Sequence, residues 1–83
     1  MQTILIDGSL YATAKDLHLA LKRLLSLPDY YGLNADALSD CLSERAACPG
    51  LWFSCEGPED VARALRLIAR VFADQGGEVK EIP

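Results

Sequence analysis

Residues 51–82 read LWFSCEGPEDVARALRLIARVFADQGGEVKEI, and this stretch decides the fold. It opens with an apolar, aromatic run at residues 51–55, which is typical of a β-strand. The sequence Gly57-Pro58-Glu59-Asp60 predicts a helix start, because proline suits the first helical position and acids suit the first turn. An apolar stripe with helical spacing follows until Gly76-Gly77 ends it, and residues 79–82 predict a further short strand. Strands joined by a helix favour a right-handed crossover and a parallel sheet.

The first half of the chain repeats this alternation of strand and helix. Thr3-Ile4-Leu5-Ile6 is short, apolar and β-branched, and predicts a strand buried on both faces. A leucine stripe over residues 13–25 predicts a helix that ends before Pro28. Asn34 is a good N-cap for a second helix from Ala35 to about Arg45. The expected fold is therefore α/β, with a small three-stranded parallel sheet packed with helices.

Length and charge limit the possible functions. The 83 residues allow one domain, residues 1–83. No apolar run approaches the roughly 18 residues of a membrane helix, and the N-terminus shows no signal peptide, so we expect a cytoplasmic protein without membrane contact. The net charge of −4 argues against nucleic acid as a direct partner, because phosphate contacts need basic residues, and favours a basic partner.

Catalytic and metal-binding patterns are sparse. The three cysteines form no Cys-x-x-Cys pair, so neither a disulfide framework nor a zinc site is expected, and nothing indicates a cofactor. His18 is the only histidine and lies beside Leu17 on the first helix, where a structural or surface histidine is more typical than a general base. The chain is therefore not expected to be an enzyme. An enzyme would require a concave pocket lined by Asp36 or His18 with a perturbed pKa.

The most informative feature is an acidic row on the second helix. Asp36, Asp40 and Glu44 stand at positions i, i+4 and i+8, although like charges at this spacing cost a few tenths of a kcal/mol per pair. A solvated helix face would explain the row, and a protein-binding surface would explain it too. Tyr30 and Tyr31 come just before this helix and favour the second interpretation, although one of the two rings is expected to plug the core.

The last helix carries basic residues that are expected to be neutralised within the helix itself. Arg63 and Arg70 stand four residues from Glu59 and Asp74, respectively, which is the spacing of salt-paired solvent faces. These arginines therefore do not indicate a nucleic-acid-binding stripe.

Residues 27–42, LPDYYGLNADALSDCL, resemble the barstar family of inhibitors of the secreted ribonuclease barnase. The resemblance implies a three-stranded parallel sheet packed with helices, and inhibition by occlusion of a basic active site. Asp40 matches the family's central acid, which takes the place of an RNA phosphate, and Asp36 matches a second contact acid. Tyr30 matches the aromatic residue near the catalytic histidine, and Gly32 and Asn34 match further contact positions.

Two positions depart from the family pattern, because the family has tryptophans where this chain has Ser39 and Arg45. Asp74 aligns with an acid of the last helix that also touches the enzyme. The expected partner surface comprises Tyr30, Gly32, Asn34, Asp36, Ser39, Asp40, Glu44 and Asp74. The resemblance implies a ribonuclease inhibitor of the antitoxin or immunity type that is a monomer when free. The alternative is an acidic module of the same fold that binds a non-ribonuclease toxin or a regulatory protein.

Overall fold

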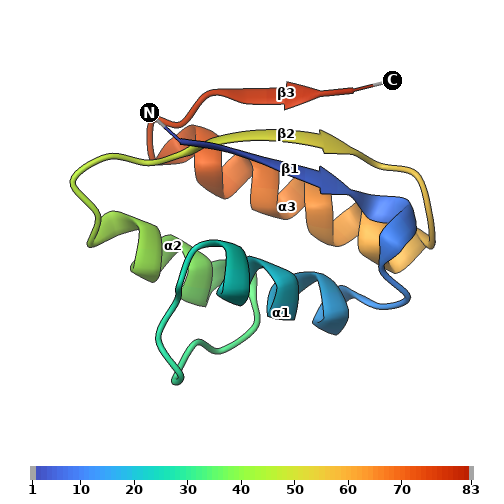
Figure 1. Cartoon of the computed structure of the whole chain (residues 1–83), viewed down its shortest axis with the longest axis horizontal. Helices are drawn as coiled ribbons and strands as arrows, with labels where there is room; N and C mark the ends of the chain where they lie inside the picture. Colours follow the sequence, from blue (N-terminus) through green and yellow to red (C-terminus); the bar gives the residue numbers. More distant parts are fainter. Residues whose placement is uncertain (1, 83) are drawn as a thin grey trace.

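Strands and helices alternate along the chain in the computed structural model, which describes residues 2–82 (Figure 1). In chain order the elements are β1 (Thr3–Asp7), a 3-10 turn η1 (Gly8–Leu10), α1 (Ala14–Leu24), α2 (Ala35–Ser43), β2 (Gly50–Ser54), α3 (Glu59–Asp74) and β3 (Val79–Glu81). All the strand pairings are parallel, in the order β1-β2-β3, with Ile4 opposite Leu51 and Leu51 opposite Val79. The predicted α/β class and three-stranded parallel sheet are confirmed.

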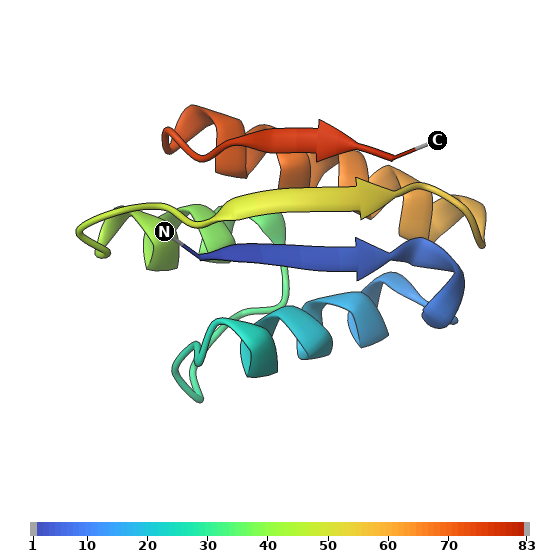
Figure 2. The same ribbon diagram turned by 45° about the horizontal axis from the view of Figure 1, so that its top comes forward.

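The helices cover only one face of the sheet, as Figures 1 and 2 show. The strand order advances in one direction, so right-handed crossovers place every connecting helix on the same side. Burial along β1 consequently alternates: Ile4 and Ile6 are buried, whereas Leu5 is 66% exposed. The prediction that this strand is buried on both faces was therefore wrong.

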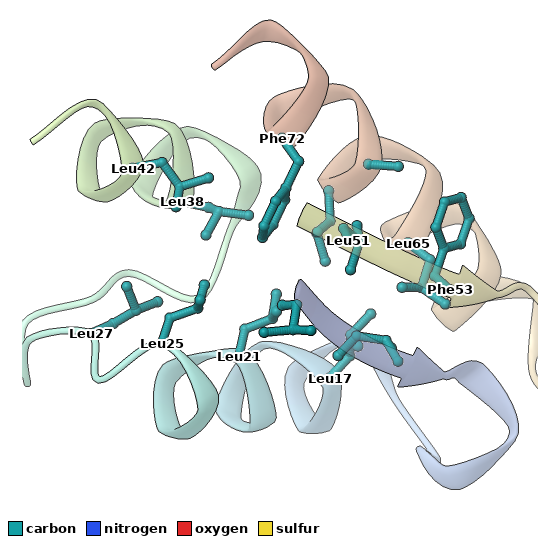
Figure 3. Close-up of a cluster of buried hydrophobic side chains, with 14 of the residues drawn as sticks. Leu17, Leu21, Leu25, Leu27, Leu38, Leu42, Leu51, Phe53, Leu65 and Phe72 are labelled. Carbon is teal, nitrogen blue, oxygen red and sulfur yellow. The ribbon is translucent and has the colours of Figure 1, made fainter. Parts of the chain in front are cut away.

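The hydrophobic core lies between the sheet and the three helices (Figure 3). The fully buried side chains include Leu17 and Leu21 of α1, Leu38 of α2, and Leu65 and Phe72 of α3. Each large apolar side chain removed from water contributes about 1.5–3 kcal/mol. α2 thus owes its place to a buried stripe on one side, which leaves its other side free to face solvent.

α1 and α3 end in the same backbone motif, with a left-handed residue directly after the helix cap. Ser26 takes this position after α1 with φ 52°, and the Leu27 amide donates back to the Lys22 carbonyl at 2.9 Å. Gly76 takes it after α3 with φ 86°. Both helix ends agree with the predictions. Pro58, predicted at the first helical position of α3, instead occupies the N-cap one residue earlier.

Candidate partner-binding surface

The loop between α1 and α2 turns its two tyrosines in opposite directions. Tyr31 is 5% exposed, and its hydroxyl lies 2.7 Å from Nδ1 of the buried His18. Burial, with a smaller contribution from Cys41, raises the pKa of Tyr31 well above its ordinary value. Tyr30 is 79% exposed. The expectations that one ring plugs the core and that His18 is structural are both confirmed.

Asn34 sets the geometry at the start of α2. Its Oδ1 accepts a hydrogen bond from the Ala37 amide at 2.8 Å, so it caps the helix as predicted. Its Nδ2 donates to the Gly32 carbonyl at 3.1 Å and so ties the end of the loop to the first helical turn. Between them, Leu33 adopts φ 55°, a left-handed conformation that is uncommon outside glycine.

The three acids of the predicted row are all exposed. α2 ends at Ser43 and Glu44 is its C-cap, so the helix is two residues shorter than predicted. Ion pairs within residues 2–82 join Lys22 to Asp29 and Arg63 to Glu59, and none involves the row.

Two acids of the row affect the pKa of Cys41, a half-buried residue of α2. Burial is the main cause that raises the pKa of Cys41, and Glu44 and Asp40 raise it further. Arg45 opposes them. The C-terminal half of α2 therefore carries a negative field that Arg45 offsets only in part.

The end of α3 reaches α2 through Gln75, a residue that sequence reasoning missed. Its Nε2 donates to Ser39 Oγ at 3.3 Å, although the two residues are 36 positions apart. Asp74, the last residue of α3, is exposed beside it. No motif or periodicity in the sequence marks Gln75, because its contact depends only on how α2 packs against α3.

Arg45 makes a contact that the sequence did not indicate, and Arg70 lacks the ion pair that the sequence predicted. The Arg45 guanidinium donates to the Leu25 carbonyl, which caps the C-terminus of α1, where a cation is favourable. Arg63 pairs with Glu59 at 3.3 Å as predicted. The predicted pair between Arg70 and Asp74 is absent among the ion pairs of residues 2–82. In that pair the acid follows the base along the helix, which is the less favourable order at this spacing.

Residues 1–80 match the family model described as Barstar (barnase inhibitor). The chain belongs to the barstar family. It is also similar to "Putative ribonuclease inhibitor YrdF" of Bacillus subtilis (strain 168), with 51% identity over 43 residues. This alignment covers 52% of the chain and 47% of the relative, so it spans about half the length of that curated protein. Both descriptions denote inhibitors, which confirms the expectation that this barstar-family chain is not an enzyme.

His18 also lines a hollow of about 420 Å³ between α1, the start of α2 and α3. Burial lowers the pKa of His18, as the enzyme alternative required. However, its Nδ1 is occupied by Tyr31, Asp36 is not among the lining residues, and the other polar side chains there are Lys15 and Asn34. Among the described residues, the lining of this hollow therefore offers no hydroxyl, thiol or carboxyl group to work with the imidazole.

The three cysteines of this barstar-family chain are free and half-buried. Burial is the main cause that raises the pKa of Cys41, Cys48 and Cys55. The described residues contain no cluster of three metal-ligating side chains. They also contain no helix long and apolar enough to cross a bilayer.

Proposed function

We propose that the chain is a protein inhibitor that binds a basic ribonuclease and occludes its active site with α2 and the preceding loop. The proposed contact residues, which we call the α2 surface, are Tyr30, Gly32, Asn34, Asp36, Ser39, Asp40, Glu44 and Asp74. The observation that carries the proposal is the exposed acidic row without ion-pair partners in the described chain, next to an exposed tyrosine. Family membership supports the same conclusion.

The energetics of α2 support a binding role for the row. Asp36 lies in the first turn, where a negative charge is favourable. Asp40 and Glu44 repel each other one turn apart, and Glu44 lies at the negative end of the helix dipole. The last turn of α2 contains no basic residue that would offset this repulsion. A helix selected only for stability would not keep this arrangement, whereas a surface selected to meet a cationic site would.

The proposed mechanism is replacement of the RNA phosphate by a carboxylate. Asp40 would enter the group of arginines that holds the phosphate, because a carboxylate accepts two parallel hydrogen bonds from a guanidinium. Tyr30 supplies a rigid aromatic ring that packs and excludes water around the charged contacts. The remaining acids attract the basic partner at long range, so they act mainly on the association rate.

The alternative function is an acidic module of the same fold that binds a non-ribonuclease toxin or a regulatory protein. The observation that favours it concerns Ser39 and Arg45, where the family resemblance calls for tryptophans. Both side chains make bonds inside the molecule, to Gln75 and Leu25 respectively. These positions consequently lack the aromatic contact area that the family pattern would provide.

The test compares Asp40→Asn with Glu56→Gln, which removes the same charge from the exposed loop after β2. Binding to basic ribonucleases, with barnase as the first probe, would be measured by stopped-flow kinetics between 50 and 500 mM salt. A central charged contact is expected to cost about 2 kcal/mol or more, a magnitude taken from measured interfaces, barnase–barstar among them. The control should change the affinity by less than about 0.5 kcal/mol.

A loss below about 1 kcal/mol for Asp40→Asn would contradict the proposed role of Asp40. A pull-down from the native host then separates the two functions. Recovery of a basic nuclease supports inhibition of a ribonuclease, whereas a non-nuclease partner that requires Asp40 supports the alternative.

A further inference from the structure

The loop that carries Tyr30 is fastened to α1 from inside the molecule. We propose that His18 is a positioning residue: its buried, neutral imidazole holds Tyr31 and thereby fixes the loop that presents Tyr30 and Asn34. The proposal rests on the proposed function, because it assigns to His18 the conformation of that binding surface.

The bond between His18 and Tyr31 is the principal side-chain tie between α1 and this loop. Nδ1 and the hydroxyl are 2.7 Å apart, and the ring centroids are 5.9 Å apart at an interplanar angle of 52°. The Tyr31 hydroxyl also approaches the Asn34 carbonyl, at a marginal 3.5 Å. A second tie in the described chain, the ion pair of Lys22 with Asp29 at 3.6 Å, has a fully exposed carboxylate and therefore contributes little.

The loop needs such an anchor because its backbone is strained at both ends. Ser26 and Leu33 have φ values of 52° and 55°, and they bracket the segment that contains both tyrosines. Left-handed conformations at residues other than glycine persist only where surrounding contacts hold them. Tyr31 lies two residues before Leu33, so loss of its anchor would release the strained turn next to the N-cap Asn34.

The groups around His18 favour a neutral ring. From α1, Lys15 lines the same hollow, whereas α3 contributes the uncharged Ala64 and Leu67 there. From α2, Cys41 is near enough to contribute to the raised pKa of Tyr31, and burial raises the pKa of its thiol, which favours the neutral form. The Asp60 carboxylate of α3 is bonded to the Ala14 amide at the start of α1.

Protonation of His18 therefore places a cation where no acid lines the site and where Lys15 is nearby. Burial lowers the pKa of His18 below its ordinary 6.5, so the unfolded chain binds the proton more readily than the folded one. The contribution of His18 to stability is complete above pH 6.5 and is lost as the pH falls towards the lowered pKa. The hollow beside the ring gives solvent a route to it.

The first experiment uses the isolated protein and measures amide hydrogen-exchange protection by NMR. The reporters are the Tyr31 amide, which donates to the Pro28 carbonyl at 3.0 Å, and the Ala37 amide, which donates to Asn34 Oδ1. His18→Leu and Tyr31→Phe, which keep the apolar packing and lose the bond, should each lower protection at these amides at least ten-fold. Tyr30→Phe is the matched control, because it removes an exposed hydroxyl and should change nothing.

The pH profile separates positioning from simple packing. Between pH 7.5 and 5.5 the protection factors of the two reporter amides should fall in the wild type. His18→Asn places an amide near the position of Nδ1 but does not titrate, so it should retain much of the protection and lose the pH dependence. Unchanged protection in both His18→Leu and Tyr31→Phe, or the same pH dependence in His18→Asn as in the wild type, would overturn the proposal.

The second experiment measures binding with barnase as the probe. His18→Leu should raise the dissociation rate at least ten-fold, and acid should weaken the wild type more than His18→Asn, because the titration of barnase itself is common to both. If the loop loosens but the dissociation rate does not change, the positioning role is wrong while the proposed function stands. If wild-type protein does not bind barnase, the proposed function fails for that ribonuclease, and the exchange data alone decide whether His18 fixes the loop.

Discussion

Replacement of Glu44 by lysine is expected to stabilise the fold and weaken partner binding at the same time. Glu44 is exposed at the C-cap of α2, one turn after Asp40, and the last turn contains no basic residue. Lysine would turn the repulsive i, i+4 pair with Asp40 into an attractive one. The repulsion destabilises the helix by about 0.2–0.5 kcal/mol, and the attraction stabilises it by a similar amount. It would also place a cation at the negative end of the helix dipole, where a charge contributes about 0.3–1 kcal/mol.

Together these effects predict about 1–3 kcal/mol of added stability at low salt for Glu44→Lys and about half of that for Glu44→Gln. Arg45 does not cancel the gain, because its guanidinium donates to the Leu25 carbonyl at the end of α1 and forms no ion pair with Glu44 within residues 2–82. Urea unfolding followed by the fluorescence of Trp52, the only tryptophan, measures the change. For a chain of this size, 1 kcal/mol corresponds to a rise in Tm of about 4–8 °C.

The gain should shrink in 1 M salt, since it comes from exposed charges. Binding to a basic partner should weaken in the same two variants, with lysine worse than glutamine. If both variants were no more stable than the wild type at low salt, the conclusion that the acidic row destabilises α2 would be refuted. If Glu44→Lys bound the basic partner more tightly than the wild type, the assignment of Glu44 to the α2 surface would be refuted.

Three further predictions concern the helix ends, the core and the thiols. In urea titrations, Ser26→Gly should stabilise the protein by about 0.5–1 kcal/mol and Gly76→Ala should destabilise it by a similar amount, because both positions have a left-handed backbone. Changes of the same sign in the two variants would contradict this explanation. Leu38→Ala should cost about 2–5 kcal/mol of unfolding free energy, since the side chain is fully buried beneath the acidic row; a loss below 1 kcal/mol would mean that α2 does not depend on this contact. Cys48 should react with iodoacetamide at pH 8 more slowly in the folded than in the urea-unfolded protein, because burial raises its pKa and so lowers the thiolate fraction; equal rates would contradict the raised pKa.

Much of the candidate surface was accessible to sequence reasoning because its parts depend on near neighbours. Asn34 caps α2 through the amide three residues later, so a local rule located the helix start. The spacing of Asp36, Asp40 and Glu44 placed them on one side of that helix, and all three are exposed. Their function as a contact surface stays a prediction.

The sequence by itself determined the order of strands and helices, most of their ends and most of the buried stripe of each helix, because periodicity and capping act between residues a few positions apart. The predicted stripe of α1 was wrong at Leu24, which is 46% exposed. Only the tertiary structure decided that one sheet face stays open, that Tyr31 and not Tyr30 enters the core, and that Gln75 and Arg45 reach Ser39 and Leu25. The last two contacts join residues 36 and 20 positions apart. Such contacts follow from how packed elements meet in space, and no local pattern along the chain encodes them.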